Sequence, residues 1–214
     1  DVQAPTAILR FALPEIPLWR RLAGHGFGRF RAGDLLGILP ESASVPRFYS
    51  LASGRRDGFI EIVVKKHPGG LCSTQLFGLE PGDTVSAFLR RNPGFHPGRG
   101  RAPLILIGAG TGIGPLAGFV RANRRQRPIH LFFGMRHPGS DFLYDAELTG
   151  WQREGRLRHL ATACSRGRMP RYVQDALREE AAEITRLVAR GARVMVCGGR
   201  DMAAGVSAAL TDIL

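Results

Sequence analysis

The sequence has little cysteine, and the few cysteines present do not build a framework. Cys72, Cys164 and Cys197 are odd in number, lie far apart and include no CxxC pair. This pattern excludes a disulfide scaffold and argues against a zinc site. The 6 histidines show no ligand spacing either, so we expect no metal. Three unpaired thiols fit a reducing compartment, and one of them could be reactive.

Long hydrophobic runs are also missing. The longest apolar stretches, such as residues 103–110, are far too short to cross a bilayer. No cationic start followed by an apolar run marks a signal peptide. We therefore expect a cytoplasmic protein with no membrane segment, or one on the cytoplasmic side of a membrane if a longer parent is anchored. The chain begins at Asp1 without Met, which we interpret as a piece of a longer protein.

Acidic residues are scarce relative to basic ones. The chain has 18 acidic and 30 basic residues, nearly all of the latter arginine, and a net charge of +12. Such a surplus indicates an anionic partner or a solvated basic surface. The arginines are scattered, and no helix-turn-helix, RNA-recognition or zinc-finger pattern is present, which disfavours nucleic acid. A nucleotide phosphate and an acidic protein partner account for the charge at least as well.

The first half of the chain reads as β-structure. Its apolar segments are short, rich in β-branched or aromatic residues and bounded by Gly, Pro or Asp, which is typical of a barrel or sandwich. The expected strands are 6–14, 35–40, 47–53, 59–66 and 84–90. A linker rich in Pro, Gly and Arg follows at residues 91–103.

Beyond this linker, apolar runs alternate with helical patterns. Near-continuous apolar strands between helices indicate a parallel sheet covered on both faces. The expected strands are 103–110, 129–136, 157–164 and 192–199, and a single long amphipathic helix is expected over 171–191. We therefore predict a two-domain α+β protein, with an antiparallel β-barrel over residues 1–98 followed by a doubly wound α/β domain over residues 99–214.

Several strand ends carry residues that suit a nucleotide. In a doubly wound sheet, ligands bind beyond the carboxyl ends of the strands. GAGTGIGP (108–115) could bring backbone N–H groups to a phosphate, although it matches neither GxGxxG nor a Walker loop and could be only a tight turn. CSRGRMPRY (164–172) has three arginines for a phosphate dianion, or is a solvated loop. CGG (197–199) could admit a flat ring, although a buried cysteine is usually a small hydrophobe.

Two segments of the first half raise the same question. RFYSLAS (47–53) combines a cation, an aromatic ring and two hydroxyls, so it is either an ordinary strand or a site for a flat anionic ligand. HPGGLCST (67–74) has two glycines before small and hydroxyl side chains, which could hold a second phosphate or form an ordinary loop.

Taken in order, these segments resemble the ferredoxin–NADP reductase superfamily. Within it the pattern looks most like the diflavin reductase branch, to which FLYDAEL (142–148) is also similar. The resemblance covers residues 5–214. It implies an FAD-binding barrel domain followed by an NADP(H)-binding domain, with FAD and NADPH as cofactors.

The resemblance also implies roles for residues of the first half. Arg47 would meet the flavin pyrophosphate, Tyr49 would pack against the isoalloxazine ring, and Ser50 would be catalytic by hydrogen bonding near flavin N5. Further contacts to the FAD pyrophosphate would come from Leu71, Cys72 and Ser73.

In the second half, the resemblance assigns a contact to each part of NADPH. The NADPH pyrophosphate would be held by Gly110, Thr111 and Gly112. The adenosine 2′-phosphate and the adenine–ribose end would be bound by Ser165, Arg166, Tyr172 and Gln174. Cys197 would be catalytic by lying beside nicotinamide C4 and orienting the hydride. The family often has Lys before this Tyr, whereas Pro170 and Arg171 stand here, so Arg168 or Arg171 would substitute.

The chain departs from the family in three further places. Gly199 stands where the family has an acidic residue, and the helical insertion of diflavin reductases is missing before RFYS. The chain stops at Leu214, without the acidic residue and terminal aromatic that usually follow. A flavin face lacking that tail should be more open, with slower or less selective hydride transfer.

The implied function is an NADPH-dependent flavoprotein oxidoreductase module. NADPH would deliver a hydride to FAD, and electrons would pass singly to an acidic electron-transfer partner: an FMN domain, a flavodoxin, or an iron–sulfur or haem protein. The alternatives are a flavin or ferric reductase that uses free acceptors, and a non-catalytic nucleotide-binding module.

Overall fold

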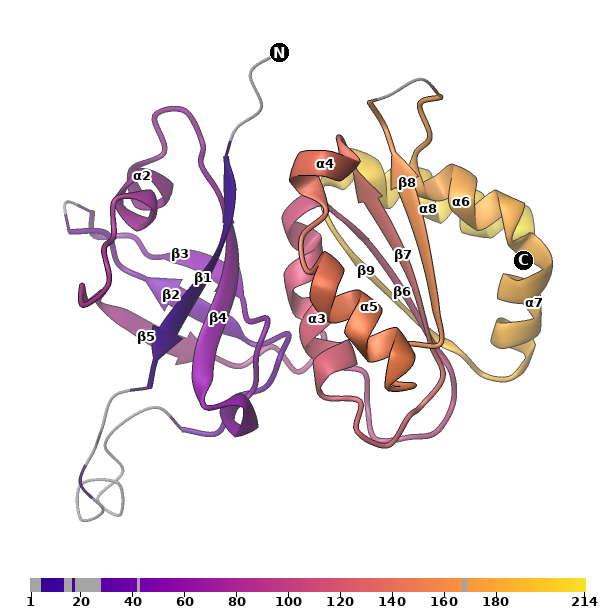
Figure 1. Ribbon diagram of the computed structural model, residues 1–214, viewed down its shortest axis with the longest axis horizontal. Coiled ribbons are helices and arrows are strands. Elements are labelled where there is room, and N and C mark those ends of the chain that lie inside the picture. The colour runs from indigo at the N-terminus through magenta and orange to yellow at the C-terminus, as the bar shows by residue number, and fades with distance from the viewer. Residues whose placement is uncertain (1–4, 14–16, 18–27, 42, 167–168) are drawn as a thin grey trace. The chain divides into compact units, whose positions relative to one another are not determined.

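The computed structural model describes residues 5–13, 17, 28–41, 43–166 and 169–214. The chain divides into two compact units, residues 1–96 and 97–214 (Figure 1). Each unit has its own sheet structure and its own hydrophobic core.

In the first unit, the described strands are all antiparallel. β1 (Thr6–Ala12) pairs with β4 (Phe59–Lys65), and β2 (Leu35–Ile38) lies between β3 (Arg47–Ser50) and β5 (Ala87–Arg90). A bridge between Leu51 and Ile62 joins the two sheets. The short 3-10 turn η1 (Arg55–Asp57) precedes β4, and the helix α2 (Leu71–Phe77) follows it.

Strand alternation forms the core of this unit. Successive side chains of a strand point to opposite faces, so Ile60, Ile62 and Val64 of β4 share one face and meet Leu36 and Ile38 of β2. Cys72 and Leu76 of α2 pack against the same cluster. The start of α2 is therefore fixed by packing to the sheet that carries RFYS.

In the second unit, the described strands form one parallel sheet in the order β8-β7-β6-β9. Their bounds are β6 Leu104–Ala109, β7 Ile129–Met135, β8 His159–Cys164 and β9 Arg193–Cys197. The chain builds outward from β6 to β8 and then returns to the other side of β6 with β9. The order therefore reverses between β6 and β9, and such a switch point is where open α/β sheets bind ligands.

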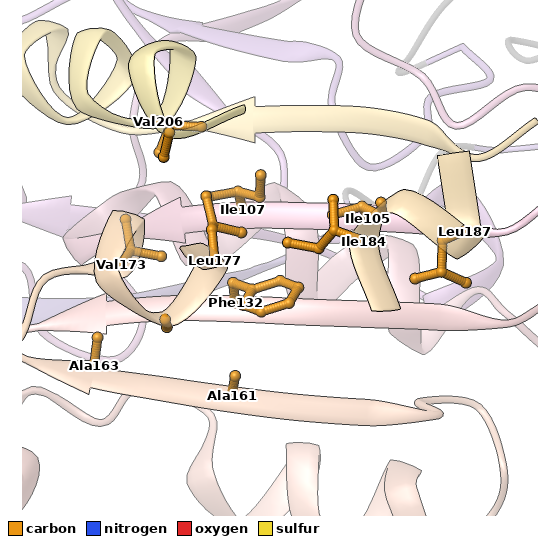
Figure 2. Close-up of a cluster of buried hydrophobic side chains, with 12 residues drawn as sticks. Ile105, Ile107, Phe132, Ala161, Ala163, Val173, Leu177, Ile184, Leu187 and Val206 are labelled. Carbon is orange, nitrogen blue, oxygen red and sulfur yellow. The ribbon is translucent and has the colours of Figure 1, made fainter. Parts of the chain in front are cut away.

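Helices cover this sheet on both faces. Those of the first face are α6 (Val173–Glu179), α7 (Ala181–Ala189) and α8 (Arg200–Ile213), whose Leu177, Ile184 and Val206 pack on Ile105, Ile107 and Phe132 (Figure 2). The 3-10 turn η2 (Gly110–Gly112) leads into α3 (Ile113–Arg121), which contacts β6, β9 and α5 (Asp145–Arg153). The remaining described helix is the short α4 (Pro138–Asp141). Leu104 and Leu106, of opposite parity to Ile105 and Ile107, are buried as well, so both faces are covered.

The prediction of a single helix over 171–191 is wrong, because the structure has two helices there, α6 and α7. Glu180, at φ −103° and ψ 24°, separates α6 from α7. A carboxylate oxygen of Glu180 lies 2.9 Å from Nε2 of His159 on β8, which ties the break to the sheet. Periodicity did not reveal this break because both helices keep their apolar residues toward the same core cluster.

Candidate functional site

The RFYS strand places its predicted ligand residues on two different faces. Arg47 and Tyr49 of β3 share one face, and Phe48 and Ser50 share the other. Tyr49 packs against the core of its unit, while Arg47 is exposed at the rim of the same face. The strand thus places a cation and an aromatic ring on one face, and their contacts with a flavin stay a prediction.

Tyr49 connects this strand to α2. Burial raises the pKa of its phenol, and a hydrogen bond with the Cys72 side chain raises it further, while the nearby Arg47 guanidinium acts in the opposite direction. The phenol is therefore neutral at physiological pH. Arg47, Tyr49 and Cys72, which are up to 25 positions apart in sequence, lie in one neighbourhood of the fold.

The segment HPGGLCST is a turn leading into a helix. The Ser73 hydroxyl is buried, donates to Gly70 O at 3.1 Å and accepts from His67 N at 3.1 Å. Its single hydrogen is therefore used inside the turn. The first backbone N–H groups of a helix have no intrahelical acceptor, so those of Leu71 and Cys72 are the donors best suited to a phosphate. A hydrogen bond from the Ser73 hydroxyl to the pyrophosphate stays a prediction, and it would require this hydroxyl to turn away from Gly70 O.

The opposite face of the same sheet holds residues that the sequence did not single out. Gly37 pairs with both Phe48 and Phe88, whose rings meet edge to face at 5.9 Å between centroids. A Cβ on Gly37 would lie 2.5 Å from the Phe88 ring, so this glycine admits the aromatic pair. The guanidinium of Arg90 lies 5.2 Å from the Phe48 ring centroid. Ser50 lies on this face as well. The sheet register brings these residues together, and the sequence alone does not specify that register.

At the end of β6, the two glycines of the GTG turn have different roles. Gly110 has φ 55°, in the left-handed region, and open space where a Cβ would lie. A Cβ on Gly112 would lie 2.0 Å from the carbonyl oxygen of Cys197. Gly112 therefore lets the turn approach the end of β9 at the switch point. Thr111, between them, is half-buried in the same turn.

Cys197 is a neutral thiol in this environment. Burial raises its pKa to about 11, so the thiolate is negligible at physiological pH. A neutral thiol is a weak nucleophile, and a small neutral group on which a flat ring could rest fits this environment. A Cβ on Gly198 would lie 2.1 Å from the terminal methyl of Met202 and would have to displace it, whereas a Cβ on Gly199 would have nothing within 4 Å.

The loop after β8 is held by backbone hydrogen bonds. Ser165 N and Oγ both donate to Met135 O, at 2.9 and 3.3 Å, and Arg166 N donates to Arg136 O at 3.0 Å. Arg166 is exposed. Cys164, which the sequence placed in the core, is only partly buried, and its thiol donates to Arg136 O at 2.8 Å. The thiol faces the loop because β8 ends there.

The remaining predicted contacts lie around the start of α6. Tyr172 is exposed and caps α6, with its N–H donating to Asp175 at 2.8 Å. The Gln174 amide lies against α8, 3.1 Å from where a Cβ on Gly205 would be. Arg171 bonds through its side chain to Glu179, with 2.7 Å between Nη2 and Oε2. Arg168 lies outside the described residues.

The described part of the chain offers neither a metal centre nor a membrane span. Among these residues, no group of three or more His, Cys, Asp or Glu side chains could hold a metal ion. Within the same ranges, no helix is both long and apolar enough to span a bilayer.

Comparison with known families assigns a class to each unit. Residues 2–88 match the model of an oxidoreductase FAD-binding domain, and residues 106–208 match that of an oxidoreductase NAD-binding domain. These matches give the cofactors as FAD and a nicotinamide nucleotide. Fold and site therefore define a flavin- and nicotinamide-dependent oxidoreductase module.

Relatives narrow this class to a family. The sulfite reductase [NADPH] flavoprotein alpha-component of Pectobacterium atrosepticum is 35% identical over 86% of this chain and 32% of its own length. That of Neisseria meningitidis is 32% identical over 100% of this chain and 38% of its own length. The chain thus spans about a third of the length of these relatives. It belongs to the ferredoxin–NADP reductase superfamily, in the diflavin reductase branch.

Proposed function

We propose that this module oxidises NADPH, transfers its hydride to bound FAD, and passes the electrons to a separate acceptor protein or domain. The observation that best supports this proposal is that the chain contains both candidate sites. In the first unit Arg47 and Tyr49 lie beside Cys72 of α2, and in the second unit Gly112 packs closely on Cys197 at the switch point. FAD supplies the redox chemistry when bound, because it accepts a hydride and releases electrons one at a time. The residues of the chain would bind FAD and NADPH and orient them for hydride transfer.

In the first unit, the proposed FAD contacts fall into two groups. Arg47 and the first N–H groups of α2 offer positive potential to a pyrophosphate. Tyr49 offers a neutral ring for stacking, and Ser50 offers a hydroxyl at the end of the strand. The boundary near residue 98 and the closure of the two antiparallel sheets into one barrel, through the Leu51–Ile62 bridge, are part of this proposal.

In the second unit, the nicotinamide nucleotide would extend along the carboxyl edge of the sheet. Gly110, Thr111 and Gly112 at the start of α3 would hold the pyrophosphate, and Cys197 would support the nicotinamide ring. Ser165 and Arg166 would bind the 2′-phosphate, with Tyr172 and Gln174 near the adenosine. Because only NADPH carries that phosphate, the arginine loop supports a preference for NADPH over NADH.

The electron acceptor is proposed from charge. A net charge of +12 favours an acidic partner, since complementary charge accelerates encounter. An FMN domain, a flavodoxin, or an iron–sulfur or haem protein would fit. The name of the relatives, a flavoprotein component of a sulfite reductase, supports transfer to another protein component. A reductase of free flavin or ferric iron is the second candidate, and it would turn over equally fast without any protein acceptor.

The test is the visible spectrum of FAD-loaded protein under anaerobic conditions, before and after addition of NADPH and, separately, NADH. Bleaching of the flavin band by NADPH, and much weaker bleaching by NADH, is the expected result. Flavin binding without bleaching would refute hydride transfer by this chain. Absence of flavin binding would refute the assignment of RFYSLAS.

A further inference from the structure

Arg171 is held at two places by its backbone and its side chain. Its N–H donates to the carbonyl oxygen of Cys164 at 2.8 Å, which fixes the backbone at the carboxyl end of β8, where the 2′-phosphate is expected. Its guanidinium instead contacts Glu179, the last residue of α6, at 2.7 Å. Six residues of α-helix rise about 9 Å from Val173 to Glu179. The side chain of Arg171 therefore extends along α6 and away from the loop.

This ion pair is of a kind that another anion can displace. The side chains of Arg171 and Glu179 are 36% and 57% exposed, so water screens their attraction, and such surface pairs are weak. The Arg171 Nε is buried and makes no hydrogen bond with any residue that the structure describes. A guanidinium binds a phosphate dianion through two parallel hydrogen bonds, which is stronger than its contact with a single carboxylate oxygen. An arginine side chain anchored at this backbone position is long enough to turn back to the loop.

We propose that Glu179 is a specificity-determining residue that competes with the 2′-phosphate of NADPH for the guanidinium of Arg171. This inference rests on the proposed function. Binding of NADPH would exchange the Glu179 carboxylate for the phosphate, while NADH, which lacks that phosphate, would leave the pair intact. Glu179 therefore weakens NADPH binding and lowers the preference for NADPH over NADH.

The experiment measures the dissociation constants of NADP⁺ and NAD⁺ by calorimetry on FAD-loaded protein, so that activity is not needed. Glu179→Gln keeps the shape of the side chain and removes its charge. We expect its affinity for NADP⁺ to rise about threefold to fivefold, the scale of one exposed ion pair, and its affinity for NAD⁺ to stay unchanged. The matched control is Asp212→Asn, because Asp212 accepts a hydrogen bond from Arg178 of α6 at 2.8 Å in a similar exposed pair. This control should leave both affinities unchanged.

Direct competition is separated from a general charge effect by a second background. In Arg171→Gln protein, NADP⁺ should bind more weakly than in the wild type, and addition of Glu179→Gln should then bring no gain. An equal gain in both backgrounds, the same gain in Asp212→Asn, or unchanged NADP⁺ affinity in Glu179→Gln would overturn the inference. Failure of wild-type protein to bind NADP⁺ would instead overturn the proposed function, so the two failures are distinct.

Discussion

Substitution of Gly112 by alanine tests the switch-point geometry directly. The new Cβ would lie 2.0 Å from the carbonyl oxygen of Cys197, 2.6 Å from its carbonyl carbon and 3.1 Å from Gly198 N. Ordinary van der Waals contact begins at 3.4 Å, so the turn and the end of β9 must separate by 3.4 − 2.0 = 1.4 Å. All three neighbours are backbone atoms, and no side-chain rotation relieves the contact.

The expected effect has a structural and a catalytic part. Overpacking of this kind costs about 1–3 kcal/mol of stability. A displacement of roughly 1 Å at a site that positions reactants costs on the order of 100-fold in rate. Anaerobic stopped-flow measurement of flavin reduction by NADPH should therefore show a rate about 100-fold lower in Gly112→Ala, together with a lower Tm.

The control lies in α5, outside the proposed site. Gly150 has nothing within 4 Å of the point where a Cβ would lie, so Gly150→Ala should keep the wild-type rate and should not lower the Tm. A wild-type rate of flavin reduction in Gly112→Ala would refute the reasoning. Equal loss in both variants would refute it too, because the effect would not then come from the contact with Cys197.

Three further predictions concern protonation and buried charge. Because burial raises the pKa of Cys197 to about 11, flavin reduction should show no thiol ionisation between about pH 6 and 9, and a step in that range that Cys197→Ser abolishes would contradict this. Burial lowers the pKa of His130, so the neutral ring is favoured in the folded protein. The contribution of His130 to the free energy of unfolding should therefore be fully present above about pH 6.5, the pKa in the unfolded chain, and should be lost as the pH falls below it. His130→Gln should flatten that fall in urea titrations, and an unchanged slope would count against it. Arg10→Ala removes two hydrogen bonds, of 2.9 and 2.6 Å, from the fully buried Glu61 carboxylate and should cost about 2–3 kcal/mol, so a loss below about 0.5 kcal/mol in urea unfolding would contradict the buried pair.

The sequence predicted the second unit well because its signals are local. Strands such as Leu104–Ala109 and Ile129–Met135 are almost entirely apolar, and glycine turns and helical periodicity bound them. The break at Glu180 escaped prediction because it leaves the apolar period intact, and the contact of Glu180 with His159, 21 positions away, is not visible in the local sequence. In the first unit, short segments rich in β-branched and aromatic residues and bounded by Gly, Pro or Asp predicted the strands, but nothing local specified that β2 would pair with both β3 and β5.

The candidate site shows the same division. Motif residues such as Arg47 and Tyr49 could be chosen by their chemistry and by the family resemblance. The distinct roles of Gly110 and Gly112 could not, because one depends on a backbone angle and the other on the distance to a strand that follows about 80 positions later. The pairing of Arg171 with Glu179 could not be predicted from the sequence either, because Asp175, Glu179 and Glu180 all follow Arg171 within ten positions and nothing local distinguishes them.

The three cysteines, which build no framework, differ in how far a reagent can reach them. All three are free thiols: Cys72 is buried and hydrogen-bonded to Tyr49, Cys197 lies at the switch point with a pKa raised by burial, and Cys164 is only partly buried at the start of the arginine loop. An alkylating reagent attacks an accessible thiolate, so Cys164 should be modified first. Protection of Cys164 by NADP⁺, followed by mass spectrometry, would therefore report nucleotide binding at the arginine loop in unmodified protein, with no label to introduce.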